Sequence, residues 1–575
     1  MRLGLLRTGI AVLCAAFYAA SGESVNAAEP LHARIDRLIA EKTPGYDKIA
    51  APVSSDEEFV RRVFLDVTGM IPTANQVREF LADKSPKKRT KLIDKLLATP
   101  DYARHMQRQF DVMLMRRLPQ KNVSSTEWRK FLRESFAANK PYDQLVKEIL
   151  AADGTDPKNR GPASFYLDRN GSVDKLTRDI GRIFLGADLE CTQCHNHPEI
   201  DDYKQKFYYG ISAFLVRSYV FKDRKRKRAI FAEKGVGEVS FANVFETREV
   251  TDPKKKAKLT KTTPPRVFDL QTPKEPAFKK GQEYVKKPTK RTAGQPKFSR
   301  RKLLPQFITS PKNERFARTA ANRLWAMFLG RGIVDPVDRD HGDNPPSHPE
   351  LLKFLTKEFR AHKYDIKWFV RELLLSKTYQ RSSRRLFSRD SQRSAPLRKA
   401  SESRLNELPE TAFGQAILRP MTPAQFAWSV LQATGAADIQ RKSLGKKLTE
   451  AALHKRLATY ETRFVALFGG QPGEPPEDFE SSVDQVLFLS NDKTIVSLIK
   501  RRNGNLADRL LKLPADKSDK IAEELFLNVL SRKPTKQDVK DVTEYLKNQT
   551  GPQRTTAVQD LIWAVMTSSE FRFNH

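Results

Sequence analysis

Cysteine is scarce in this sequence, with only three among 575 residues. Cys14 lies in an apolar run near the beginning, and Cys191 and Cys194 lie three positions apart near the middle. Three thiols are too few for a fold stabilised by several disulfides. Outside the initial apolar run, the chain can form at most one disulfide.

Long apolar stretches and the common enzyme signatures are also missing. Beyond the initial run, no apolar stretch reaches the roughly 20 residues that a membrane-spanning helix requires. The sequence contains no G-x-S-x-G, no H-E-x-x-H and no P-loop. It therefore lacks the usual signatures of serine hydrolases, zinc peptidases and P-loop nucleotide-binding proteins, and it assigns no reaction or substrate.

The first 27 residues have the pattern of a secretory signal peptide. Arg2 and Arg7 provide a basic start, residues 8–20 are apolar, and Ala27 is a small residue suited to signal peptidase. Cleavage after Ala27 would remove Cys14 as well. We therefore expect an exported protein of the periplasm or cell envelope, without a membrane span in the mature chain.

The mature chain is expected to be globular and strongly basic. Its length predicts two or more domains, and 39% hydrophobic with 30% charged residues is typical of soluble proteins. The formal net charge of +34 would suggest nucleic acid in the cytosol. In an exported protein it favours acidic envelope polymers or anionic lipid head groups, and no nucleic acid partner is expected. The alternative is a solvated surface that keeps the protein soluble.

Helical periodicity dominates two long stretches, so the predicted fold class is mainly α. The prediction comprises a signal peptide (1–27), a helical domain (28–218), a basic linker with short strands (219–299) and a second helical domain (300–575). Six of the seven residues at 222–228 are basic. Residues 239–244 and 245–250 are predicted strands.

Helix-capping patterns predict where several helices begin. Ser310 followed by Pro311 predicts an N-cap with proline at the first helical position. Ser347 with Glu350 three residues later predicts a capping box. Residues 175–185 are expected to form the helix that leads into the cysteine pair.

Cys191, Cys194 and His195 form a C-x-x-C-H motif, the attachment motif of c-type haem. Two thiols three positions apart can both reach the vinyl groups of one porphyrin. The adjacent imidazole then lies over the iron as its proximal ligand. The sequence therefore predicts covalent haem c on these three residues.

Two other interpretations of the motif remain open. Cys191, Cys194, His195 and His197 have side chains that suit Zn²⁺, although four ligands within seven residues are crowded for a tetrahedron. The two cysteines can also form a structural disulfide or remain free thiols.

The sequence does not identify a sixth haem ligand. The next methionine after the motif is Met327, across the linker, and His341 or His348 could approach only if the two halves pack tightly. His348 is only an accessory candidate ligand, because Ser347, His348 and Pro349 also have the pattern of an ordinary helix start.

The chain resembles a known pair of domains. The segments 64–69, 71–73, 141–144 and 184–198 resemble the planctomycete cytochrome-type domain of unknown function DUF1549 (PSCyt2 type). The segments 322–325, 328–332, 344–349 and 568–575 resemble its C-terminal companion, DUF1553 (PSD1 type). The resemblance implies an exported, mostly helical envelope protein of a planctomycete-like bacterium, and it implies no established activity.

The predicted function is that of a c-type-cytochrome-like envelope protein that transfers electrons to an unidentified redox partner through haem on Cys191, Cys194 and His195. The alternative is a non-redox envelope binding or scaffold protein. Its basic surface would engage an acidic polymer, and the C-x-x-C-H motif would be a structural or zinc site. A metal-dependent hydrolase is a third possibility, with no motif behind it.

Overall fold

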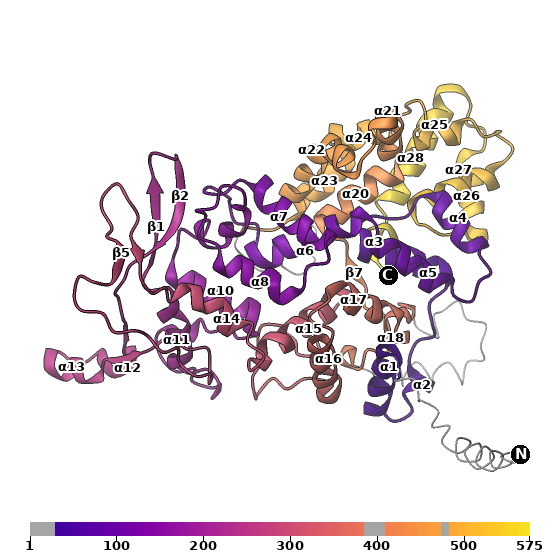
Figure 1. The fold of residues 1–575 in the computed structure, drawn as a ribbon. Coiled ribbons are helices and arrows are strands. Elements are labelled where there is room, and N and C mark those ends of the chain that lie inside the picture. Colours follow the sequence, from indigo (N-terminus) through magenta and orange to yellow (C-terminus); the bar gives the residue numbers. More distant parts are fainter. Residues whose placement is uncertain (1–28, 385–408, 473–481) are drawn as a thin grey trace, which may run out of the picture.

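The protein is mainly α-helical, as predicted, and the strands among its described residues form only two-stranded sheets. A computed structural model describes residues 29–384, 409–472 and 482–575 (Figure 1). The predicted signal peptide, residues 1–27, lies outside the described residues. Within the described residues, no helix combines the length and the apolar character needed to cross a membrane.

The first half is a succession of amphipathic helices that ends in the region of the cysteine motif. The predicted helix at 175–185 is confirmed as α10, capped by Ser172. The helices of this half are α1 (Leu31–Lys42), α2 (Tyr46–Ile49), α3 (Asp56–Thr68), α4 (Ala74–Ala82), α5 (Lys88–Leu97), α6 (Pro100–Met115), α7 (Ser125–Ala137), α8 (Tyr142–Ala151), α9 (Ser164–Leu167), α10 (Val173–Leu185) and α11 (Gln205–Leu215).

The basic insert that follows contains three small antiparallel sheets and two short helices. The elements are β1 (Ser218–Asp223), β2 (Arg228–Glu233), β3 (Val239–Phe241), α12 (Val244–Thr247), α13 (Pro253–Leu259), β4 (Lys261–Thr263), β5 (Tyr284–Lys286) and β6 (Gln295–Pro296). The strands pair β1 with β2, β3 with β4 and β5 with β6. The prediction of a strand at 245–250 is wrong. The Asn243 side chain accepts the Phe245 N–H at 2.9 Å and caps a helical turn there instead.

The second half returns to helices. Its elements are α14 (Leu304–Ile308), α15 (Glu314–Leu329), α16 (Pro349–Ala361), α17 (Ile366–Leu375), α18 (Lys377–Gln380), β7 (Arg419–Pro420), α20 (Pro423–Ala433), α21 (Ala436–Leu444), α22 (Glu450–Phe468), α23 (Val483–Asn491), α24 (Lys493–Ile499), α25 (Leu506–Leu511), α26 (Ser518–Val529), α27 (Lys536–Leu546), α28 (Gly551–Met566), α29 (Ser569–Arg572) and β8 (Phe573–Asn574).

Two predicted helix starts in this half are wrong. Ser310 lies in a turn, and α15 begins later, after Asn313. Ser347 forms no capping box, because its hydroxyl donates to the Ile333 carbonyl at 3.1 Å and His348 is the N-cap residue of α16. In both cases a tertiary contact or a competing turn binds the side chain for which the local sequence pattern predicts a capping role.

The hydrophobic core does not divide at the insert. Helices from both sides of it share one cluster, in which the Tyr142 ring of α8 stacks on Phe316 of α15 at a centroid distance of 5.2 Å. The helices from α20 onward form a second cluster, which also receives Leu65 of α3. The two cores therefore divide within the second half of the chain, near α20.

Helix α3 lies between the two cores, near the centre of the molecule (Figure 1). Every residue from Glu58 to Thr68 is buried, including four charged ones. Glu58 and Arg62 pair at 2.5 Å, and Glu58 also accepts the Ser382 hydroxyl at 2.7 Å. Arg61 donates to the Phe571 carbonyl at 2.9 Å, near the C-terminus. Each of these three charges therefore has a partner within the protein interior.

Asp66 is the meeting point of three segments that are distant in sequence. Its carboxylate accepts from Arg419 of β7 at 2.7 Å and from the Tyr379 hydroxyl of α18 at 2.8 Å. It also accepts from the side-chain amide of Asn574 at 2.7 Å. Asn574 belongs to β8, which pairs with β7. One carboxylate therefore connects α3, α18 and the two-stranded sheet.

Replacing Asp66 by Ala is expected to destabilise the protein by about 3–5 kcal/mol, because Arg419 would be left without its buried partner. The measurement is the shift of the urea unfolding midpoint. Glu41→Ala is the control, since Glu41 forms an exposed ion pair with Arg37 and should cost less than about 1 kcal/mol. Equal shifts for the two variants would contradict this account of α3.

Candidate functional site

The cysteine motif lies in a tight turn between α10 and α11. Helix α10 ends at Gly186, whose φ of +62° is a left-handed conformation. A side chain at this position would also come within 2.8 Å of the Thr319 hydroxyl. The motif then forms a 3₁₀ turn over Cys191–Gln193. The Tyr209 hydroxyl of α11 donates to the Gln193 carbonyl at 2.7 Å, which attaches the turn to the helix that follows.

Both thiols are free and exposed. The Cys194 N–H donates to the Cys191 carbonyl at 3.3 Å, so the two residues are one 3₁₀ turn apart. Residues three positions apart eclipse one another in a 3₁₀ helix, and both thiols therefore lie on the same side of the turn. No disulfide joins the two thiols in this structure.

The orientation of the His195 ring leaves one nitrogen available. Its Nδ1 lies 2.5 Å from the carbonyl oxygen of Asn196. A carbonyl oxygen only accepts hydrogen bonds, so Nδ1 carries the proton and Nε2 keeps its lone pair. This is the arrangement that metal-ligating histidines use, with the second nitrogen donating to a carbonyl. The Asn196 side chain is itself held, because it accepts the Gln205 N–H at 2.9 Å.

Exposed apolar side chains lie beside the motif. The Phe245 ring is 4.9 Å from the His195 ring and is 66% exposed. Its neighbour Val244 is 46% exposed and donates its N–H to the Cys194 carbonyl at 3.0 Å. Both come from α12 of the insert. Sequence reasoning missed Phe245 because it assigned this segment to a strand of the linker, away from the motif.

His197 has a different role from His195. Its Nδ1 accepts the backbone N–H groups of Glu199 at 3.2 Å and Ile200 at 3.0 Å. The proton of the neutral ring must therefore be on Nε2, and neither nitrogen offers a lone pair to a cation. His197 stabilises the turn that follows the motif, and it gives no support to the zinc alternative in this conformation.

Comparison with known protein families finds one matching family for each half of the chain. Residues 34–219 match the family model PSCyt2, described as a protein of unknown function (DUF1549). Residues 300–546 match PSD1, described as a protein of unknown function (DUF1553).

This chain is a PSCyt2–PSD1 protein.

The two domains occur in the predicted order, and the planctomycete source stays a prediction. No curated protein and no solved structure matches the chain.

The PSD1 domain packs against the connection between α10 and α11, on either side of the cysteine turn. The Asp340 N–H donates to the Gly186 carbonyl at 2.8 Å, and the Gly342 N–H donates to the Asp202 carboxylate at 2.6 Å. The His341 ring lies 5.3 Å from the Tyr203 ring. The halves are therefore packed tightly, which was the condition for a histidine of the second half to approach the motif.

His348, the accessory candidate, is a buried histidine of the PSD1 domain. Its ring lies 5.6 Å from that of Phe413, and its Nδ1 is 3.2 Å from the Ser347 hydroxyl. Burial, assisted by the charge of Lys42, lowers the pKa of His348 to about 4. It is neutral near pH 7, and none of these contacts joins it to the cysteine turn.

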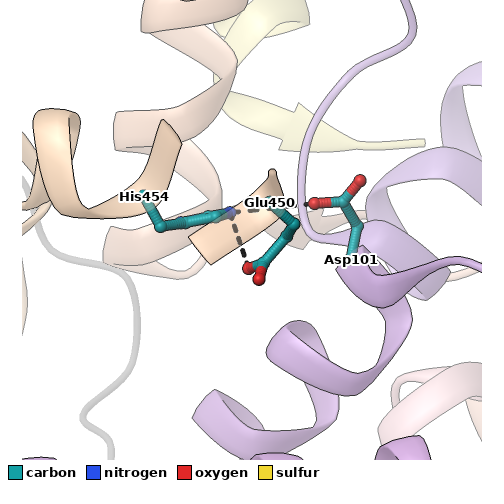
Figure 2. Close-up of side chains that lie close together, drawn as sticks. All are labelled: Asp101, Glu450 and His454. Atoms are coloured by element: carbon teal, nitrogen blue, oxygen red, sulfur yellow. Dashed lines mark ion pairs between the residues drawn. The ribbon is translucent and has the colours of Figure 1, made fainter. Parts of the chain in front are cut away.

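A second group of ligand-type side chains joins the two domains (Figure 2). His454 Nε2 lies 3.3 Å from Glu450 and 3.7 Å from Asp101 of the PSCyt2 domain. Among the described residues, only these three His, Cys, Asp or Glu side chains converge closely enough to hold a metal ion. Sequence reasoning did not find this group, because Asp101 is more than 300 positions away from Glu450 and His454.

The surroundings of His454 argue against a metal. Arg108 Nη2 lies 3.2 Å from His454 Nδ1, and a guanidinium only donates. Nδ1 must therefore accept, so that the proton of the neutral ring is on Nε2 and faces the two carboxylates. Arg104 contacts both oxygens of Glu450. We interpret the group as a polar contact between the domains.

The stability of the same contact is predicted to depend on pH through Glu461. The Glu461 carboxylate binds Arg108 at 2.5 Å and the Trp428 indole N–H at 2.7 Å. Burial alone would raise the pKa of Glu461, but Arg108 and the hydrogen bonds outweigh it and lower the pKa to about 2. The lowered pKa stabilises the fold above pH 4.5, and this contribution disappears as the pH falls from 4.5 to about 2.

Glu461→Gln is therefore expected to cost on the order of 3 kcal/mol at pH 7 and much less at pH 2.5. The melting temperatures of variant and wild type at both pH values provide the measurement. Glu134→Gln, on the exposed face of α7, is the control and should have little effect at either pH. A Glu461→Gln cost independent of pH would refute the assignment.

Proposed function

We propose that this PSCyt2–PSD1 protein is an exported electron-transfer component of the cell envelope that carries covalent haem c. Cys191 and Cys194 would form the thioether bonds, and His195 would be the proximal ligand. The observation that carries the proposal is the hydrogen bond from His195 Nδ1 to the Asn196 carbonyl. It leaves Nε2 available as a ligand atom on the residue that follows Cys194, and both thiols are free.

The residues around the motif fit a haem group. The two thiols lie on one side of a 3₁₀ turn, as attachment to a single porphyrin requires. Phe245 and Val244 offer an exposed apolar surface beside His195. An unpartnered apolar surface of this kind is costly in water and suits an apolar macrocycle. Bound haem would supply one-electron redox chemistry to the protein.

The chain's own residues would have three tasks at this site. The Asn196 carbonyl orients the imidazole and keeps the proton on Nδ1. Phe245 covers one side of the His195 ring. Arg178 binds Glu190 at 2.6 Å and the Gln193 side chain at 2.7 Å, which fixes the turn that presents the thiols.

The second candidate is a non-redox envelope binding or scaffold protein. The observation that favours it is the basic insert, in which most lysine and arginine side chains are exposed. In this case Cys191, Cys194 and His195 would be free structural groups or partial ligands of a zinc ion. The two candidates differ in whether the purified protein contains iron, zinc or neither.

An absorption spectrum of the protein, purified from a periplasm with cytochrome c maturation machinery, tests the proposal. We expect a Soret band and, after dithionite, sharp α and β bands that survive denaturation because the haem is covalently attached. Cys191→Ala combined with Cys194→Ala should remove all covalent haem.

His197→Asn is the matched control from the same turn. The Asn Oδ1 can accept the backbone N–H groups that His197 Nδ1 accepts, so haem content should stay at the wild-type level. A colourless wild-type protein would refute the haem proposal. Stoichiometric zinc that depends on the two cysteines would then favour the second candidate.

A further inference from the structure

The insert, residues 218–299, is strongly basic. It contains 22 Lys or Arg and nine Asp or Glu, an excess of 13 positive charges. Twenty of the 22 basic side chains are exposed. Of those 20, all within the described chain, only Arg226 forms an ion pair, with Asp223 at 3.3 Å. The insert thus presents many cations without a counterion.

Acidic residues of the insert are used where it joins the helical body. Glu238 and Glu275 bind the buried Arg300 at 2.8 and 2.5 Å. The same two carboxylates bind the buried Arg217 at 2.8 and 3.2 Å. This network anchors the base of the insert, and it leaves the outer part with an even larger excess of positive charge.

The insert also exposes apolar side chains among these cations. Five of the thirteen large apolar residues that the described chain leaves exposed lie in it, although it is only 82 residues long. Val285 is 67% exposed and Val236 is 55% exposed. Isolated exposed apolar residues are common, but their concentration within a cationic segment fits a partner that offers both negative charge and apolar surface.

Three of these apolar residues, Val236, Phe278 and Val285, lie on neighbouring segments. The Tyr284 hydroxyl accepts the Gly235 N–H at 2.9 Å, which brings Val236 next to β5. Lys297 donates its N–H to the Glu283 carbonyl at 2.8 Å, and its ammonium lies 5.8 Å from the Phe278 ring. We call these residues, with the adjacent Lys234, Lys279, Lys280, Lys286, Lys287 and Lys297, the basic-apolar patch.

The patch lies at one end of the molecule. Figure 1 shows β1, β2 and β5 projecting from the helical body, on the side away from α25 and α27 of the PSD1 domain. Nothing in the described structure covers Val285 or the two lysines that follow it, all of which are exposed. This end of the protein can therefore approach a flat surface.

We propose that the basic-apolar patch is a docking site for a membrane surface that contains anionic lipids. Lysine side chains gain free energy near anionic head groups, and exposed Val and Phe side chains gain more by entering the boundary between head groups and acyl chains. A soluble polyanion would use the lysines but would leave the aliphatic side chains in water. The combination of both properties favours a lipid surface. The proposal does not rest on haem binding.

The test is co-sedimentation of the full-length mature protein with vesicles at 0.1 M salt. Vesicles of phosphatidylcholine with 30% phosphatidylglycerol should bind the protein, and pure phosphatidylcholine vesicles should not. Removing two charges by Lys286→Gln with Lys287→Gln should weaken binding roughly 10- to 30-fold. Val285→Ser should weaken it roughly threefold or more, because one apolar side chain no longer enters the lipid boundary.

Lys446→Gln with Lys447→Gln is the matched control. It removes the same charge from an exposed lysine pair, next to the exposed Leu448, in the PSD1 domain. We expect it to bind vesicles like the wild type. All substituted side chains are exposed, and unchanged melting temperatures would verify that the variants are folded.

Three outcomes would overturn the proposal. The first is absence of binding to the anionic vesicles. The second is an equal loss of binding for the control pair and the patch pair, which would indicate nonspecific attraction by net charge. The third is a loss with the lysine variants but none with Val285→Ser, together with equally tight binding of soluble dextran sulfate. That result would identify a soluble polyanion as the ligand.

Discussion

Charged side chains on the buried helix α3 constrain the arrangement of the rest of the chain. An ion removed from water costs several kcal/mol unless a partner compensates it. Glu58 and Arg62 pair with each other. Glu58, Arg62 and Asp66 also bind residues that are more than 300 positions away in the sequence. The requirement brings α18, β7 and the C-terminal β8 against a helix near the beginning of the chain. The two hydrophobic cores meet along the same helix.

This packing makes the cysteine turn a product of the whole protein. The turn belongs to the PSCyt2 domain, but Asp340 and Gly342 of the PSD1 domain bind residues on either side of it, and the insert supplies Phe245. The insert thus contributes both an apolar side chain at the proposed haem site and the basic-apolar patch.

Several elements could be predicted because their information is local. The mainly α fold follows from helical spacing of apolar residues, and α10 was predicted almost to its ends. Predictions failed where a local pattern had to compete with other contacts. Ser347 has the spacing of a capping box, but its hydroxyl binds the Ile333 carbonyl. Phe245 has strand-like neighbours, but Asn243 caps a helical turn there.

The sequence by itself determined the two-domain identity, the helical class and the three-position spacing of the two thiols. Those properties depend on residues within a few positions of each other. Tertiary structure decided which histidine keeps a free nitrogen: the Asn196 carbonyl fixes the His195 proton, while backbone N–H groups occupy His197. It also decided that His454 Nε2, which faces two carboxylates, carries the proton and has no free lone pair, because Arg108 of another helix donates to Nδ1. A motif lists possible ligand atoms, but the hydrogen-bond partners that folding brings to each ring select the atom that remains free.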